Sequence, residues 1–266
     1  MTTPTTTPIT GPVTPPGTRD LREPVTQPAY TVRIADTEEQ VRAAQRLRHR
    51  VFATEQGACL DTAVAGHDVD PFDAYADHLL VVETATEEVV GTYRLFPPGR
   101  GPSYAATEFD LAGLPDDVRA SMVETGRVCV DPAHRTGAVI TLLWSGIARY
   151  VLLSGHRYLG GCASVSLDDG GRAAAHVSAL ADAHRPPADF AVLPRNPWQG
   201  PSAAVTGAQY DAPATTPPLL RAYLRFGAWI CGAPHHDPAF ATADFFVLLD
   251  LDAMHDRYRR FFLADR

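Results

Sequence analysis

Residues 122–154 read MVETGRVCVDPAHRTGAVITLLWSGIARYVLLS, and this stretch indicates how the chain folds. Its apolar residues over roughly 125–130 predict a strand, and the apolar run from Ala138 to Ser154 predicts a helix. The run is interrupted by Arg149 and is shorter than the roughly 20 residues of a membrane span, so we expect a core helix. A polar turn that contains Gly137 joins the two elements.

The turn between this strand and this helix is a candidate anion site. Backbone N–H groups at a helix start lack partners within the helix, and the helix dipole adds positive charge there. Such a helix start binds a phosphate or pyrophosphate without any lysine. An ordinary helix start without a ligand is the alternative. The predicted phosphate-binding residues are Val130, Arg135, Thr136, Gly137 and Ala138, with a bidentate contact from the arginine.

Strands and helices are mixed along the rest of the chain. Upstream, the patterns predict a strand at 30–35, a helix opened by a capping box of Thr37 and Gln40, and a hairpin of 78–83 and 89–96. Downstream, they predict strands at 158–165 and 245–251 and helices at 168–183, 219–226 and 252–262, the last capped by Asp252. Because strands and helices do not alternate strictly, an α+β domain with a mixed sheet fits better than a doubly wound one.

Composition narrows the function classes. A formal charge of -8 and a pI near 5.6 argue against a nucleic-acid binder. All 23 basic residues are arginine, so no lysine is present for a Schiff base or a phosphate loop. The cysteines at 59, 129, 162 and 231 form no C-x-x-C pair, and we predict reduced, buried thiols in a cytosolic protein.

The first 28 residues hold nine threonines and seven prolines and hardly any large apolar side chain. Such a segment cannot bury enough apolar surface to offset its ordering entropy, so residues 1–28 are predicted to be a disordered tail. It has no basic region followed by an apolar stretch, so we expect no signal peptide. Residues 29–266 are predicted to form a single domain.

Two charged residues of the central strand, Glu124 and Arg127, form a second candidate site. Strict strand alternation would send their side chains to opposite faces of the sheet. A bulge at Gly126 would turn both toward one site. A surface ion pair at the start of the strand is the alternative.

Arg48 lies on the apolar face of the first predicted helix. An arginine there needs an acceptor, because its desolvation without one is costly. We expect that acceptor to be Glu55 or a member of the acidic cluster that follows it. A buried structural ion pair and a role in substrate binding are both open. The neighbours of Arg48 on this face are Val41, Ala44, Val51 and Phe52.

The acidic cluster contains Asp70, Asp73 and Asp77. Asp70 precedes Pro71, which is typical of a helix N-cap followed by proline at the first helical position. Three carboxylates on one side of a short helix would suit a substrate that carries an ammonium group. Capping and solvation are the alternative.

The run His235-His236-Asp237 does not predict a metal site. Adjacent histidines point in different directions in any regular element, and no spaced ligand set accompanies them. We therefore predict no metal.

Several ordered motifs resemble one known family. They are LRHRVF (47–52), DPFD (70–73), DHLL (77–80), VGTYRL (90–95), ETGRVCVDP (124–132), LWSGI (143–147), LGGCAS (159–164), LRAYLRFG (220–227) and DFF (244–246). Over roughly residues 30–262 the chain resembles the bacterial ornithine-acyl-ACP N-acyltransferases, the lyso-ornithine lipid synthases, some of which are labelled hemolysin-like. More distantly it is similar to the acyl-homoserine-lactone synthases.

The resemblance implies a GNAT-like α+β fold. In such a fold a mixed, mostly antiparallel sheet is flanked by helices and opens between two strands into a cleft for the acyl donor. It implies an acyl carrier protein as donor, whose phosphopantetheine thioester enters as substrate, and no permanently bound cofactor. An amine of an amino acid, ornithine in this family, would be the acceptor.

The resemblance and the chemistry of the reaction together suggest roles for single residues. Glu124 would accept the proton of the amine, and Asp70 or Asp73 would hold the ammonium. Arg94 and Arg127 would hold the carboxylate of the acceptor or orient the acids. Backbone N–H groups at 128–130 would stabilise the oxyanion, and the glycine turn would hold the donor phosphate. The predicted substrate-binding residues are Arg48, Phe52, Asp70, Asp73 and Arg94.

Other functions are open at this stage. GNAT phosphate loops usually carry a further glycine where Ala138 follows Gly137, and its absence favours a carrier-protein phosphate over the pyrophosphate of CoA. The alternatives are an acyl-CoA-dependent amine N-acyltransferase, a homoserine-lactone synthase, or a non-catalytic protein that binds acyl carriers or membranes. Helices at 219–226 and 252–262 would give the last of these a peripheral contact with the inner membrane face; packing on the domain's own sheet is the competing interpretation.

Overall fold

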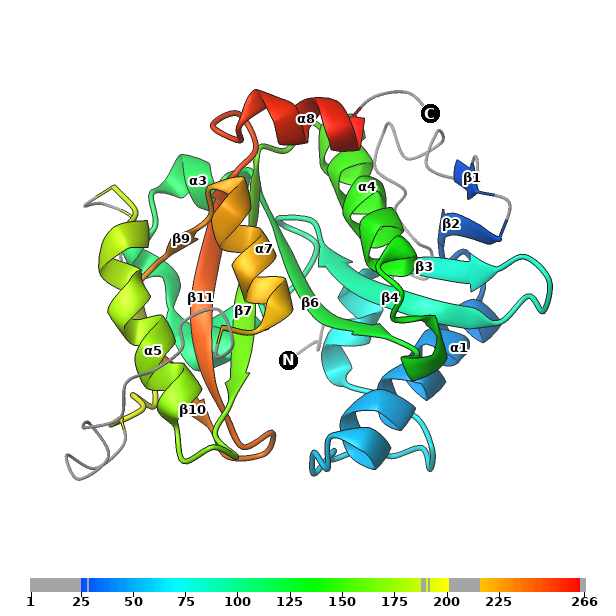
Figure 1. Cartoon of the computed structure of the whole chain (residues 1–266), viewed down its shortest axis with the longest axis horizontal. Coiled ribbons are helices and arrows are strands. Elements are labelled where there is room, and N and C mark those ends of the chain that lie inside the picture. The colour runs from blue at the N-terminus through cyan, green and yellow to red at the C-terminus, as the bar shows by residue number, and fades with distance from the viewer. Residues whose placement is uncertain (1–24, 28, 188–189, 191, 201–215, 264–266) are drawn as a thin grey trace, which may run out of the picture.

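The structure is a computed structural model that describes residues 25–27, 29–187, 190, 192–200 and 216–263 (Figure 1). Residues 1–24 and 28 of the predicted tail lie outside the described residues. Within the predicted tail, Val25–Gln27 form the short edge strand β1.

A single nine-stranded sheet runs through the domain, and helices cover both of its faces. Its order is β1-β2-β3-β4-β6-β7-β11-β10, with β9 paired to the outer part of β11. Besides β1, the strands of this sheet are β2 (Tyr30–Ile34), β3 (Asp77–Glu83), β4 (Val89–Phe96), β6 (Met122–Val130), β7 (Tyr158–Ser166), β11 (Thr242–Asp250), β9 (Trp229–Ile230) and β10 (His235–Asp237). All neighbours are antiparallel except β6 and β7, so the predicted α+β, mostly antiparallel mixed sheet is confirmed. The short strands β5 (Phe109–Asp110) and β8 (Leu193–Pro194) form a separate pair.

The two principal helices lie on opposite faces of the sheet (Figure 1). Leu79 and Val81 of β3 belong to the core cluster under α4 (Ala138–Leu153), whereas Leu80 and Val82 pack with Ala44 of α1 (Glu38–His49). This alternation follows from the two-residue period of a strand. Thr37 caps α1 as predicted, and its side chain accepts a hydrogen bond from the Gln40 N–H.

Strands β6 and β7 separate soon after they meet. Their parallel pairing covers only the pairs Met122–Tyr158, Val123–Leu159 and Glu124–Gly160. Beyond it, β6 stays with β4 as far as Val130, and β7 stays with β11 as far as Ser166. The sheet therefore opens between its two halves, as the family resemblance implied.

A register shift interrupts the pairing of β4 and β6 between Thr92 and Arg94. The expected bulge is present, but the left-handed residue is Arg127, with φ of 53°, rather than Gly126. The extra residue changes the alternation, so Glu124 and Cys129 both face α1, and Arg127 comes to the same side.

The remaining α-helices are α2 (Ala105–Glu108), α3 (Asp116–Ala120), α5 (Arg172–Leu180), α7 (Pro218–Phe226) and α8 (Asp256–Leu263). A π-helix covers Arg50–Glu55. Short 3-10 helices cover Pro71–Tyr75, Leu111–Gly113, Pro132–His134 and Ala181–His184. Two boundaries were predicted wrongly. Asp252 does not cap the last helix, because its N–H donates to Asp250 and α8 begins four residues later. Gly170 and Gly171, both at positive φ, delay α5 until Arg172.

Candidate functional site

The opening between β6 and β7 connects cavities on the two faces of the sheet. A cavity of about 610 Å³ lies on the α4 side and is lined by Gly137, Ile140 and Trp144 among others. One of about 270 Å³ lies on the α1 side and is lined by charged residues. Gln56, Val128 and Leu219 line both, so the two cavities meet at the opening. A reaction in this opening can be reached by one substrate from each face.

Three arginines and three aspartates form a buried network beside the charged cavity. Arg48 binds Asp73 with two hydrogen bonds of 2.9 and 2.8 Å and contacts Asp68 at 2.9 Å. Arg94 bridges Asp70 and Asp73 at 2.6 and 2.9 Å. Although burial opposes its charge, the guanidinium groups of Arg48 and Arg94 hold the pKa of Asp73 well below its ordinary range. The six side chains balance in charge.

The network decides between the two expected acceptors of Arg48. Its partner is Asp73 of the acidic cluster, as one of the two alternatives predicted, and not Glu55, which binds Arg135. Asp73 is not free to hold an ammonium, because Gln45, Arg48 and Arg94 occupy its oxygens and its side chain is only 7% exposed. It therefore has the structural role that was the alternative.

Asp77 and Asp70 also differ from the expected row of carboxylates. Asp77 lies at the start of β3, where it accepts hydrogen bonds from Arg100 and from the Tyr150 hydroxyl. Asp70 caps the turn at Pro71–Tyr75, and its side chain accepts a hydrogen bond from the Phe72 N–H. The three carboxylates therefore do not lie on one side of a helix, where they could bind an ammonium group together.

Arg94 and Arg127 both line the charged cavity, and Arg127 is the more weakly paired with the aspartates of the network. Its contacts with Asp68 and Asp70 are 3.3 and 3.5 Å, longer than those of Arg48 and Arg94. Its guanidinium lies over the rings of Tyr104 and Phe240, at 5.3 and 4.8 Å from their centroids. Aromatic faces hold such a cation in place without using its N–H donors. Those donors remain suited to a carboxylate of a substrate.

Phe52, Arg94 and Arg127 all line the charged cavity. Phe52 is buried and meets Phe240 edge to face at 6.1 Å. Arg94 is 1% exposed, and its bonds to Asp70 and Asp73 orient these acids. The other predicted substrate-binding residues, Arg48, Asp70 and Asp73, do not line this cavity. Asp70 pairs with Arg94 and Arg127 and so helps to hold these two arginines in place.

Glu124 is buried just behind the cavity rather than on its wall. One of its oxygens accepts a hydrogen bond from the Ala105 N–H at 2.8 Å, and the other accepts one from the Ser103 hydroxyl. Burial raises the pKa of Glu124, and these two hydrogen bonds offset part of the effect. The carboxylate therefore holds the turn that carries Tyr104, and Tyr104 lines the cavity.

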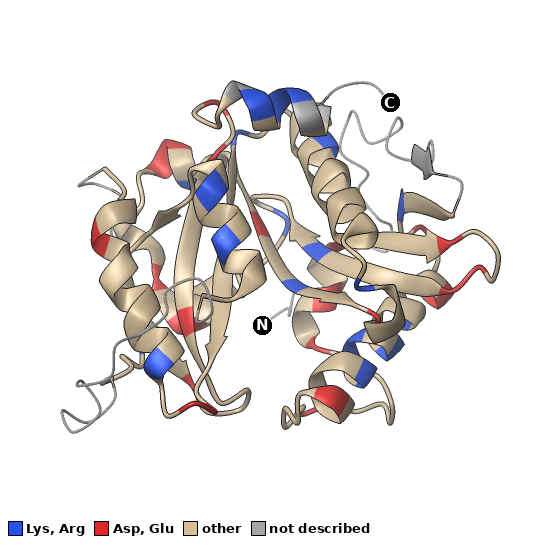
Figure 2. Ribbon diagram, in the orientation of Figure 1, with Lys and Arg blue, Asp and Glu red and all other residues tan. Residues whose placement is uncertain are grey.

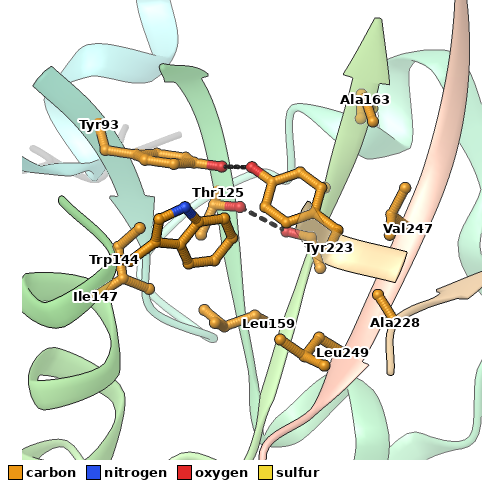
Figure 3. A pocket seen from close by; sticks show the side chains of 13 residues that line it. Tyr93, Thr125, Trp144, Ile147, Leu159, Ala163, Tyr223, Ala228, Val247 and Leu249 are labelled. Carbon is orange, nitrogen blue, oxygen red and sulfur yellow. Dashed lines mark hydrogen bonds between the residues drawn. The ribbon is translucent and has the colours of Figure 1, made fainter. Parts of the chain in front are cut away.

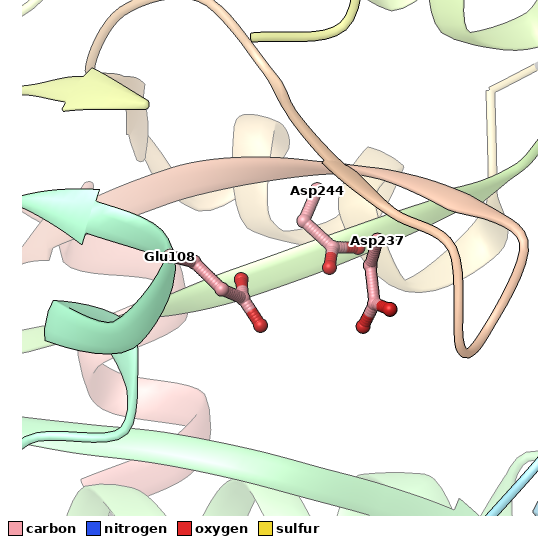
Figure 4. A group of neighbouring side chains, drawn as sticks. All are labelled: Glu108, Asp237 and Asp244. Carbon is pink, nitrogen blue, oxygen red and sulfur yellow. The ribbon is translucent and has the colours of Figure 1, made fainter. Parts of the chain in front are cut away.

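The opposite wall of the charged cavity carries three acids that converge from separate elements (Figure 4). Glu108 ends α2, Asp237 ends β10 and Asp244 lies in β11. One oxygen from each lies within 4.8 Å of the others. Burial, together with the neighbouring carboxylates, holds the pKa of Glu108 and of Asp244 above the ordinary range. Such a group of acids attracts a cation.

The predicted phosphate turn lies at the mouth of the α4-side cavity. Gly137, with φ of 91°, directly precedes α4, and no side chain caps the helix there. His134, Arg135 and Gly137 line the cavity, but Thr136 and Ala138 do not. Arg135 binds both oxygens of Glu55 at 2.5 and 2.7 Å, so its guanidinium is shared with a carboxylate rather than free.

A narrow apolar cavity of about 30 Å³ continues from the opening into the core (Figure 3). Trp144, Leu159 and Leu249 line it. Tyr93 and Tyr223 lie at its end next to the charged cavity, and their hydroxyl groups are hydrogen-bonded to each other. Its lining is apolar, and its volume is that of a small internal void.

Helices α7 and α8 pack on the domain rather than standing apart from it. Phe226 of α7 meets Trp144 and Phe262 edge to face at 5.0 and 5.2 Å. Arg257 and Arg259 of α8 are exposed, and Figure 2 shows basic residues along this helix. Within the described ranges, no helix is both long enough and apolar enough to cross a membrane.

The prediction for the cysteines is wrong for Cys59, which is exposed; Cys129 and Cys231 are buried, Cys162 is partly exposed, and all four thiols are free. Sequence reasoning also missed functional candidates. Asp68 was overlooked because nothing in its neighbourhood marks it. Tyr104, Glu108 and Asp244 come from separate elements, and only the motif around residue 244 gave a signal.

Comparison with known proteins agrees with this geometry. Residues 47–145 match the family model for an acetyltransferase (GNAT) domain. The chain is 35% identical to the L-ornithine N(alpha)-acyltransferase of Brucella abortus, over 88% of this chain and 89% of that protein. It is 32% identical to the protein of the same name from Rhodobacter capsulatus, over 88% and 95%.

Solved structures with the same fold include acyl-homoserine-lactone synthases. The synthase LasI aligns with a TM-score of 0.50 and 13% identity, covering 88% of this chain and 94% of LasI. The structure of TofI, in a ternary complex with an inhibitor and MTA, aligns with a TM-score of 0.52 and 15% identity, over 89% and 97%. These likenesses concern the fold.

Proposed function

Because the chain belongs to the L-ornithine N(alpha)-acyltransferase family, we propose that it moves a fatty acyl group from an acyl-carrier-protein thioester to the α-amine of ornithine. The observation that carries this proposal is the pair of cavities that meet between β6 and β7. One is mostly apolar beyond a helix N-terminus, and the other is charged, as a lipid-like donor and an amino-acid acceptor require.

The donor enters from the α4 side. Its phosphate lies at the N-terminus of α4, where backbone N–H groups and the helix dipole favour an anion. Arg135 adds charge there while Glu55 holds it in position. The pantetheine arm follows the cavity wall along Val128 to the opening, and the acyl chain lies against the apolar side chains of the 610 Å³ cavity beside Ile140 and Trp144.

The acceptor enters from the α1 side, where Arg127 binds its α-carboxylate. An α-ammonium cannot attack a thioester until it loses a proton, and Glu124 takes that proton through the Ser103 hydroxyl or a water. The raised pKa of this buried carboxyl suits it to accept a proton.

The transfer itself exchanges one bond for another. The neutral amine attacks the thioester carbon, and backbone N–H groups of residues 128–130 stabilise the oxyanion that forms. The carbon–sulfur bond then breaks as the carbon–nitrogen bond is completed. The nitrogen gives up its second proton and the pantetheine sulfur leaves as a thiol, so the products are an N-acyl amino acid and the free carrier. This donor is a soluble protein, so the proposal also places the chain in the cytoplasm.

The test is thiol release from acyl-carrier protein and from acyl-CoA with the same acyl chain, each with ornithine as acceptor, followed by mass spectrometry of the product. We expect release from the carrier protein with N-acyl-ornithine formed. Equal use of acyl-CoA would contradict the carrier-protein donor, and product formation only with another amine would contradict the acceptor.

A further inference from the structure

The acidic wall of the charged cavity has features that a solvated surface cluster lacks. Glu108 and Asp244 are only 6% and 3% exposed. The three carboxylates come from α2, β10 and β11, so the fold brings them together from positions up to 136 residues apart along the chain. Burial of several like charges is unfavourable unless a cation or a proton is shared among them.

The backbone and hydroxyl contacts of these acids hold them in place and leave one oxygen without a partner. Asp237 accepts a hydrogen bond from the Ala239 N–H at 2.8 Å, and Asp244 accepts one from the Thr242 hydroxyl at 3.0 Å. The Tyr104 hydroxyl and the Cys162 thiol lie close enough to the Glu108 carboxyl to lower its pKa, against the rise that burial causes. Its Oε2 atom is nevertheless buried without a hydrogen bond of normal geometry to the part of the chain that the structure describes. Glu108 lines the cavity, and its carboxylate points toward the other two acids (Figure 4). This oxygen can therefore accept a further hydrogen bond from a ligand.

We propose that Glu108, Asp237 and Asp244 bind the side-chain ammonium of the ornithine acceptor, and so determine both its selection and the position of acylation. An ammonium has three N–H donors in a compact group, which matches three carboxylates around one point. The proposal rests on the proposed function, because it assigns one end of the same acceptor.

Arg127 provides the other end of this arrangement. It lines the same cavity, and its charge lowers the pKa of Asp244 slightly while burial raises it. With the carboxylate at Arg127 and the distal ammonium at the acids, the α-amine is the nitrogen left free to attack. The structure thus explains how one of two similar amines is selected.

The raised pKa of Glu108 and of Asp244 supports a cation-dependent site. In the empty cavity the acids retain protons to relieve their mutual repulsion. An ammonium that enters stabilises the charged forms, so its binding releases protons.

The experiment compares L-ornithine with L-norvaline, which has the same carbon chain and lacks only the distal amine. Wild-type protein and the variants Glu108→Gln and Asp244→Asn are given both acceptors in competition, with the same acyl donor, and the product ratio is measured. Asp252→Asn, an exposed acid beyond the same strand, is the control. Thermal unfolding of each variant shows that it is folded.

We expect each variant to raise the KM for ornithine about 10- to 100-fold, as the loss of a charge-assisted hydrogen bond does. The kcat at saturating ornithine and the rate with norvaline should change little, so the product ratio moves toward norvaline. The control should behave as the wild type. Calorimetry without donor should detect proton release on binding ornithine and none on binding norvaline.

Two results would overturn the proposal while leaving the proposed function intact. One is an unchanged ornithine-to-norvaline ratio in folded variants of an active enzyme. The other is loss of ornithine acylation on chelation, restored by a divalent cation, which would assign the acids to a metal. Failure of the wild type to acylate ornithine with any donor would instead contradict the proposed function itself.

Discussion

At the scale of single residues, the site depends on charges that are buried in balanced groups. Arg48, Arg94 and Arg127 share the carboxylates of Asp68, Asp70 and Asp73, so none of the three arginines is buried without an acceptor. Removing one partner of such a pair typically costs about 3–5 kcal/mol, because the other charge stays buried. The network thereby fixes Arg127 at the edge of the cavity.

The role of Glu124 can be tested by Glu124→Gln. The amide oxygen can still accept from the Ala105 N–H and the amide can donate to Ser103, so the turn should keep its shape. We expect kcat to fall roughly 10²- to 10⁴-fold with little change in thermal stability, because a proton acceptor is lost. Steady-state kinetics with the exposed Glu88→Gln as control measure this. Unchanged turnover would remove Glu124 from catalysis and leave it a structural role.

Sequence reasoning at this scale reached some residues and not others. An arginine on an apolar helix face must have an acceptor, and Arg48 does; the bulge that brings Glu124 and Arg127 to one face also followed from the strand pattern. The partner Asp68 was not predictable, because it depends on the path of an irregular loop twenty residues further along. The convergence of Glu108 and Asp244 depends on how β11 is placed in the sheet, which local patterns do not encode.

At the scale of elements, the decisive feature is that β6 and β7 pair only briefly. The apolar strands, the hairpin and α4 were predictable because their hydrophobic periods are strong. Their separation was implied only by the family resemblance. Gly161 marks the place in β7: a Cβ atom there would lie 2.3 Å from the Thr125 carbonyl oxygen of β6. A contact with backbone cannot be relieved by a side-chain rotation.

Gly161→Ala should therefore force the two strands apart. We expect it to destabilise the fold by about 1–3 kcal/mol, as overpacking does, and to reduce activity more than the loss of stability alone explains. Urea unfolding followed by circular dichroism measures the first effect. Gly126→Ala, in β6 where a Cβ meets nothing within 4 Å and φ is not positive, is the control for the stability effect of replacing a strand glycine. If the Gly161 variant were as stable and active as wild type, the close approach would not matter.

At the scale of the whole molecule, the sheet separates two cavities and joins them at one opening. The α4 side presents a helix N-terminus and apolar rings, and the α1 side presents the arginine network and the acids. In the function that we propose, donor and acceptor each have their own face, so a protein-bound donor would dock without obstructing the amino acid. Figure 2 shows basic residues on α7 and α8, and Arg225, Arg257 and Arg259 of these helices are exposed.

The pH dependence of the protein's stability should reflect the raised pKa of the acids in the acidic wall. The folded-state pKa of Glu108 and of Asp244 is raised, so their contribution to stability is full below the ordinary carboxyl range of about pH 4 and is lost as pH rises toward neutrality. The double variant Glu108→Gln with Asp244→Asn lacks this loss. We expect wild type minus variant Tm to decrease between about pH 5 and pH 7.5.

Asp73 acts in the opposite direction, since its lowered pKa stabilises the fold above its ordinary range and this stability is lost in acid. The effect of Asp73 is common to wild type and double variant, so it cancels in the difference between their Tm values. Thermal unfolding of both proteins across this pH interval measures that Tm difference. A Tm difference that stays constant or grows with pH would show that the two acids are not perturbed.

The most direct test of the proposed acceptor binding is the position of the acyl group in the product formed from acyl-carrier protein and ornithine, read by tandem mass spectrometry against synthetic standards. We predict acylation of the α-nitrogen with the distal amine free, because in our proposal Arg127 and the acidic wall hold the two ends of the acceptor. Acylation of the distal nitrogen, or no N-acyl-ornithine at all, would contradict it.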